Sequence, residues 1–153
     1  MAASEVILIA AAPAATHQIA ESLGDVRGKV IIDAMNSVRT KPDGYPTSTH
    51  ALLHLTATPD VVRCFNTTGV ENMLHPRYGE AGGEAGIDMS VAGDSERGKA
   101  VARQLALAAG FGACHDFGGA DKFELLESLA LGWVKLAVMQ RNGRDIAFRV
   151  VRR

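Results

Sequence analysis

The sequence predicts an α/β protein with an open, mostly parallel sheet and helices on both faces. Short, continuously apolar runs recur along the chain, as is typical of strands that are buried on both faces. Stretches with helical spacing separate these runs, and parallel strands joined by helical crossovers are the simplest arrangement of such an alternation. No internal repeat is found, so we interpret the 153 residues as a single domain, 1–153.

Five segments are predicted as strands of this sheet. The first, EVILIAAAP, ends at Pro13, and the second, GKVIIDAMN, lies between Gly28 and Asn36. DVVRCF, IDMSVAGD and GACHDFG follow in that order. The chain ends in GRDIAFRVVRR, whose alternation of apolar and polar residues is typical of a further strand.

Helices are predicted between these strands. Helical spacing is found in ATHQIAESLGDV, residues 47–56, GVENMLHP, SERGKAVARQLALAAG and residues 121–139. Thr47 or Ser48 can cap the second of these helices, and Ser95 can cap the fourth, which Gly110 ends.

The composition excludes several classes of partner. Hydrophobic residues make up 47% of the chain, charged residues make up 22%, and the net charge is −1. A chain with this balance has no general attraction to nucleic acid or to an anionic membrane, and no apolar run reaches the roughly 18 residues of a membrane span.

Cys64 and Cys114 lie in predicted strands without metal-ligand spacing. We interpret them as buried thiols in a reducing compartment, and we expect a cytoplasmic protein.

A parallel α/β sheet often binds a dinucleotide, whose pyrophosphate lies on a G-x-G-x-x-G turn between a strand and a helix. The sequence contains no such turn. Its nearest glycine-rich run, residues 79–83, follows a helix-like segment and a proline rather than a strand. Composition and spacing alone therefore leave the function open.

Four longer stretches carry a resemblance. They are VVRCFNTTGVENMLHPRY, DMSVAGDSERGKAVARQLALAAGF, LLESLALGWVKLA and the terminal GRDIAFRVVRR. Together, and in this order, they resemble the dinucleotide-binding reductases related to the deazaflavin (coenzyme F-420)-dependent NADP oxidoreductase. SEVILIAAAP and GKVIIDAMN resemble the two preceding strands of that family. The resemblance implies a Rossmann-type, doubly wound sheet and NADP(H) as cofactor, with a deazaflavin or flavin as a possible electron partner.

The chain departs from this family in its first half. The βαβαβ unit that carries the family's glycine-rich turn has no counterpart before Met1, so we expect an incomplete Rossmann-type sheet that corresponds to the C-terminal part of the fold. A truncated gene, a misassigned start and a naturally shortened protein are the alternatives. The same departure leaves activity uncertain. The alternative to an NADP-dependent oxidoreductase is a non-catalytic remnant that acts as an oligomerisation or interaction module.

The resemblance assigns the cofactor site to three strand ends, where ligands of such sheets bind. The candidate cofactor-binding residues are Ala11, Ala12 and Pro13 after the first strand, Asn36 after the second, and Phe65, Asn66, Thr67 and Thr68 after the third. Each has a simpler interpretation. Pro13 could merely end a strand, Asn36 could form a turn, and Asn66 to Thr68 could cap the helix that follows.

No catalytic residue and no metal site is predicted. Hydride transfer between a nicotinamide and a flavin-like ring needs no protein acid or base, because the protein aligns the two rings and excludes water. His50 and His54 lie four residues apart, but HALLH lacks the glutamate of H-E-x-x-H and a third ligand. We interpret His115 as a satisfied strand histidine, and Glu127 as a solvated residue.

The first strand is expected to have an uncovered edge. In the complete family fold, residues 6–10 lie between the family's first strand and residues 30–33. Without the former strand, an apolar edge is left that pairs readily with another strand. We therefore expect a homo-oligomer paired along this edge, or an edge covered by residues 146–151 or by the N-terminus.

Overall fold

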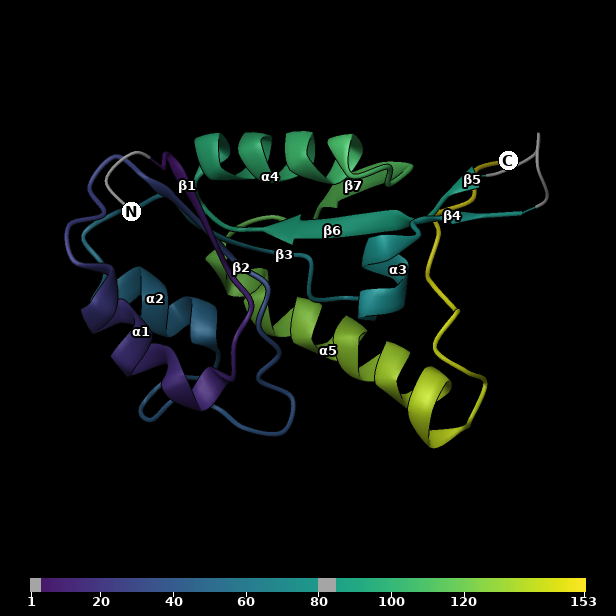
Figure 1. Cartoon of the computed structure of the whole chain (residues 1–153), viewed down its shortest axis with the longest axis horizontal. Helices are drawn as coiled ribbons and strands as arrows, with labels where there is room; N and C mark the ends of the chain where they lie inside the picture. The colour runs from purple at the N-terminus through teal and green to yellow at the C-terminus, as the bar shows by residue number, and fades with distance from the viewer. Residues whose placement is uncertain (1–3, 80–84) are drawn as a thin grey trace.

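The computed structural model describes residues 4–79 and 85–153, so residues 80–83 of the glycine-rich run lie outside the described residues. Seven strands and five α-helices are assigned in the described ranges (Figure 1). In chain order they are β1 (Val6–Ile9), α1 (Thr16–Leu23), β2 (Val30–Asp33), α2 (Ser48–Leu55), β3 (Val61–Cys64), α3 (Val70–Leu74), β4 (Arg77–Tyr78), β5 (Ala85–Gly86), β6 (Asp88–Ala92), α4 (Glu96–Ala108), β7 (Ala113–Asp116) and α5 (Phe123–Val134), which continues into a π-helical turn at Lys135–Met139.

The main sheet has the strand order β1-β2-β3-β6-β7. β1, β2 and β3 are parallel to one another, but β6 runs antiparallel to β3, and β7 is parallel to β6. The expectation of a mostly parallel α/β sheet is confirmed, with β3 and β6 as the antiparallel pair. In its described residues, the connection from β3 to β6 contains the short α3 and the antiparallel strands β4 and β5, and it returns along the sheet instead of crossing over it.

Helices cover both faces of the sheet, as predicted (Figure 1). α4 lies on one face, and α1, α2 and α5 lie on the other. The core on the α4 side consists of residues such as Ile32, Val62, Met89, Val91 and Ala102. The core on the opposite side is divided between a cluster under α1 and α2 and a smaller cluster under α5. Cys64 and Cys114 are both buried and free.

The predicted helix ends agree with the observed caps. Thr47 accepts a hydrogen bond from the backbone N–H of His50 at the start of α2, and Ser95 accepts one from Gly98 at the start of α4. α3 differs, because Gly69 is its N-cap and no side chain caps it. Asn66, Thr67 and Thr68 therefore do not serve as the helix cap that their simpler interpretation assumed.

The predicted C-terminal strand is wrong. Residues 144–153 form no strand, although the backbone N–H of Asp88 donates to the Phe148 carbonyl at 3.3 Å. Side chains hold this segment instead of a ladder. The Ile146 carbonyl accepts from Asn72 Nδ2 (2.7 Å) and from Trp133 Nε1 (2.6 Å), and the Val150 N–H donates to Asp88 Oδ2 (2.7 Å). The alternation of apolar and polar residues in GRDIAFRVVRR thus belongs to an extended segment that side-chain hydrogen bonds hold at separate points.

β1 is an edge strand of the sheet, and among the described residues its outer side has no ladder partner. The C-terminal segment lies near α3 and β6, at the other end of the sheet, so the expectation that residues 146–151 cover this edge is wrong (Figure 1). In the described part of the chain, no helix combines the length and the apolar character needed to cross a membrane.

Candidate functional site

The ends of β2 and β3 bring two asparagines together. Asn36 follows β2 by three residues, and Asn66 follows β3 by two, on adjacent parallel strands. Asn36 Nδ2 donates to the Asn66 carbonyl at 3.0 Å, and Asn66 Nδ2 donates to Asn36 Oδ1 at 3.3 Å. Asn36 is exposed, whereas Asn66 is 2% exposed. The buried Asn66 therefore holds the exposed amide of Asn36 in place.

Phe65 sets the turn between β3 and Asn66. Its φ of 62° lies in the left-handed region, which costs a non-glycine residue about 1–2 kcal/mol. Its ring packs against Phe111 with a centroid distance of 6.3 Å, in the core cluster on the α4 side. Phe65 thus contributes to the strand end through its backbone, because its side chain belongs to the core.

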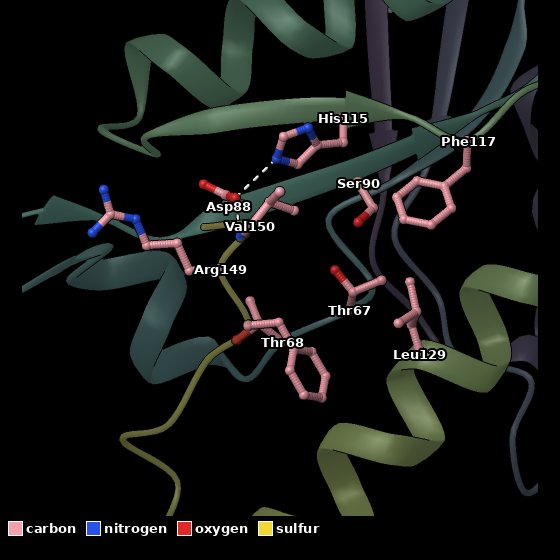
Figure 2. A pocket seen from close by; sticks show the side chains of 10 residues that line it. Thr67, Thr68, Asp88, Ser90, His115, Phe117, Leu129, Arg149 and Val150 are labelled. Atoms are coloured by element: carbon pink, nitrogen blue, oxygen red, sulfur yellow. Dashed lines mark hydrogen bonds and ion pairs between the residues drawn. The ribbon is translucent and has the colours of Figure 1, made fainter. Parts of the chain in front are cut away.

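Thr67 and Thr68 line a pocket of about 140 Å³ between β6, β7, α5 and the C-terminal segment (Figure 2). Thr67 is 5% exposed, and Thr68 accepts a hydrogen bond from Asn72 Nδ2 at 2.6 Å. His115 also lines this pocket, and its Nε2 lies 2.8 Å from Asp88 Oδ2. The interpretation of His115 as a satisfied strand histidine is consistent with this hydrogen bond.

Ala11, Ala12 and Pro13 lead from β1 into α1. Ala11 and Ala12 are exposed, while Pro13 is buried and begins a short 3₁₀ turn. They lie at the same edge of the sheet as Asn36, because β1 and β2 are parallel neighbours. Among the described residues, no hydrogen bond joins them to Asn36 or Asn66.

A buried charge network supports the loop that carries Asn36. Arg63 on β3 and Asp33 on β2 are both fully buried, and Arg63 Nη1 lies 3.0 Å from Asp33 Oδ2. Arg63 Nη2 also donates to Glu127 Oε1 on α5 and, at 2.6 Å, to the Met35 carbonyl. Ser48 and Thr49 each donate to Asp33 Oδ2 at 2.6 Å.

This network fixes the backbone on both sides of Asn36. Asp33 Oδ1 accepts from the Met35 N–H at 2.9 Å, and Glu127 Oε1 accepts from the Ser37 N–H at 2.8 Å. The interpretation of Glu127 as solvated is wrong, because its side chain is only 12% exposed. Burial raises the pKa of Glu127, and the charge of Arg63 opposes that rise.

Sequence reasoning missed this network, although one signal for it exists. Arg63 interrupts the apolar run DVVRCF, and Asp33 ends the apolar run GKVIID. A charged residue in a strand that is buried on both faces needs a partner of opposite charge nearby. Asp33 and Arg63 are indeed register partners on adjacent strands. The position of Glu127 carries no comparable signal, because it lies 64 residues from Arg63.

The imidazole rings of His50 and His54 have different hydrogen-bond partners. His50 Nδ1 lies 2.9 Å from Thr47 Oγ1, whereas His54 Nδ1 bonds the Tyr45 hydroxyl. Within residues 4–79 and 85–153, no group of three or more histidine, cysteine or acidic side chains is placed to hold a metal ion.

Comparison with known proteins shows the fold. A candidate F420-dependent NADP reductase from Arthrobacter sp. FB24 superimposes with a TM-score of 0.80 and 20% sequence identity, over 99% of this chain and 71% of that chain. A hypothetical protein from Sinorhizobium meliloti superimposes with a TM-score of 0.66 and 20% identity, over 99% of this chain and 68% of that one. No family model and no curated protein sequence matches the chain. The chain therefore has a Rossmann-like α/β fold.

Proposed function

We propose that this protein is an NADP-dependent oxidoreductase, which exchanges a hydride between a nicotinamide and a deazaflavin- or flavin-like carrier. The approach of Asn36 and Asn66 from the ends of two parallel strands carries this proposal. In sheets of this class, ligands bind beyond the carboxyl ends of the strands. The likeness of the fold to a candidate NADP reductase supports the choice of cofactor.

The chemistry of Asn36 fits a nicotinamide carboxamide. An asparagine amide offers two N–H donors and an oxygen with two lone pairs. Asn66 occupies one donor and one lone pair of Asn36, so one of each is left for a ligand. Asn36 lines a pocket together with Trp133 and two cationic residues, Arg39 and Arg144. The free donor and lone pair of Asn36 suit an uncharged carboxamide.

In this mechanism, the residues of the chain position the reactants and exclude water. A bound nicotinamide would supply or accept the hydride at its own ring. Asn36 would hold the carboxamide, Asn66 would hold Asn36, and the Asp33–Arg63–Glu127 network would keep the loop in place. No protein acid or base is assigned, because alignment of the two rings is the protein's main contribution to such a transfer.

The test is transfer of the label from NADPH deuterated at C4 of the nicotinamide. The protein is mixed with millimolar NADPH and either coenzyme F-420 or FMN. We expect NADPH oxidation that requires both protein and carrier. With coenzyme F-420, deuterium should appear at carbon C5 of the reduced deazaflavin from one of the two C4 epimers only. With FMN, whose reduced N5–H exchanges with water, the oxidised nicotinamide should lose deuterium from one of the two C4 epimers only. Oxidation at the rate of the protein-free control with both carriers would contradict the proposal.

One observation favours the alternative, a non-catalytic oligomerisation module. The outer edge of β1 has no ladder partner among the described residues, and Leu8 on this strand is 50% exposed. Natural proteins usually protect such an edge with charge or with a covering segment. Oligomerisation and the proposed redox chemistry use different parts of the sheet, so the two functions can be tested separately.

A further inference from the structure

The pocket beside Thr67 has the size and walls of a binding site for one small ring. Its volume is about 140 Å³, and a dry cavity of about 150 Å³ is known to accept benzene. Phe117, Leu129, Phe148 and Val150 supply apolar walls from three separate parts of the chain (Figure 2). A single six-membered ring therefore fits this space.

Two hydroxyl groups in the pocket wall lack a good partner. Ser90 is 9% exposed, and its hydroxyl forms no hydrogen bond with any described residue. Thr67 is 5% exposed, and its one hydrogen bond through the hydroxyl to a described residue is to Met89 Sδ, a weak acceptor, at 3.8 Å. Figure 2 shows both side chains among those that surround the pocket. Each hydroxyl can donate a hydrogen bond to a ligand oxygen without losing a strong bond in the protein.

The charged groups around the pocket favour a neutral ligand. Asp88 Oδ2 faces His115 Nε2 at 2.8 Å and accepts from the Val150 N–H at 2.7 Å. These contacts offset the charge of Asp88, but an anionic ligand would still meet this carboxylate. The guanidinium of Arg149 points away from the pocket in Figure 2, so it does not offer a counter-charge there.

We infer that this pocket binds a neutral, ring-sized molecule that carries a carbonyl oxygen, which the hydroxyls of Ser90 and Thr67 hold. The apolar body of the ligand lies against Phe117 and Leu129, and Phe148 of the C-terminal segment closes the site. This inference goes beyond the proposed function, which assigns no ligand to Ser90 or to the C-terminal segment. It concerns binding alone and does not require NADPH.

The experiment is an NMR titration of the full chain with δ-valerolactam, a neutral six-membered ring with one carbonyl. We expect saturable shifts of the methyl groups of Thr67, Leu129 and Val150. Ser90→Ala and Thr67→Val should each weaken the affinity by roughly two- to tenfold, the range expected for one lost hydrogen bond. Ser22→Ala removes an exposed hydroxyl on α1 and should leave the affinity unchanged.

Tetrahydropyran, a ring of similar size without a carbonyl, separates hydrogen bonding from simple filling of the space. It should bind the unmodified protein more weakly than δ-valerolactam, and Ser90→Ala should reduce this difference. Melting curves of each variant confirm that it is folded. The inference fails if the lactam does not shift these methyl groups, or if it binds the Ser90 and Thr67 variants as tightly as the unmodified protein. Such a result would leave the deuterium-transfer test of the proposed function unaffected.

Discussion

Asn66 is the residue that joins the ends of β2 and β3. Its carbonyl accepts from Asn36, and its side chain donates to Asn36 and, at 3.3 Å, to the Leu126 carbonyl on α5. The buried Oδ1 of Asn66 accepts no hydrogen bond from a described residue. Asn66 thus links Asn36 to α5.

Replacing Asn66 by leucine should separate the placement of Asn36 from the packing of the core. Leucine keeps similar bulk but cannot orient Asn36. We expect turnover in the deuterium-transfer assay to fall by roughly tenfold, which corresponds to about 1.4 kcal/mol of lost transition-state stabilisation. The melting temperature should fall by about 4 °C or less. Asn142→Leu, at an exposed site, is the control. Unchanged turnover with a lost melting transition would assign Asn66 a structural role only.

Glu127 should make stability depend on pH in a defined direction. Burial raises its pKa above 4.5 in the folded protein, so the folded state holds this proton at pH values where the unfolded state has released it. The contribution of the protonated group is fully present below pH 4.5 and is lost as the pH rises through the raised pKa.

The measurement is the free energy of unfolding of the wild type and of Glu127→Gln between pH 4 and 7. The stability of the wild type relative to the variant should decrease as the pH rises above about 4.5. If the stability of the wild type relative to Glu127→Gln instead increases with pH, the charge of Arg63 lowers the pKa of Glu127 more than burial raises it.

At the level of elements, the Asp33–Arg63–Glu127 network ties β2, β3 and α5 together. Removing one partner of a buried pair leaves an uncompensated charge, which costs about 3–5 kcal/mol. We therefore expect Arg63→Leu to lower the free energy of unfolding by about that amount in urea denaturation.

Arg97→Leu is the matched comparison. It breaks the pair with Asp60, but the Arg97 side chain is 49% exposed, so the loss should be about 1 kcal/mol or less. Equal losses for the two variants would contradict the structural role given to the buried network.

The open edge of β1 leads to a prediction about assembly. We expect two copies to pair along this edge in an isologous dimer, because an apolar, uncovered strand recruits another strand. Light scattering at low micromolar concentration should report a dimer. Leu8→Lys should yield a monomer, whereas Leu107→Lys, at a similarly exposed leucine on α4, should remain dimeric. A wild type that is monomeric under these conditions would overturn the prediction.

At the scale of the whole molecule, the order of elements and the sheet were predictable because buried strands and amphipathic helices have different apolar periods. The reversal of β6 was not, because a short helix such as α3 is compatible with either strand direction until the β4–β5 hairpin is seen. Asn36 and Asn66 were predicted as cofactor-binding residues because the resemblance assigns the cofactor site to the residues that follow these apolar runs. Sequence reasoning assigned no pocket role to Asp88, Ser90 or His115, because these residues gather only through the pairing of β6 with β7.

NMR titration with NADP⁺, observed at the side-chain amides of Asn36 and Asn66, tests the central claim most directly. The sequence has no G-x-G-x-x-G turn to hold the pyrophosphate, so we expect a dissociation constant weaker than micromolar. The amide signals of Asn36 should nevertheless shift progressively in the millimolar range, and nicotinamide mononucleotide should cause the same shifts. Shifts confined to other parts of the chain, or stoichiometric binding at low micromolar concentration, would contradict this account.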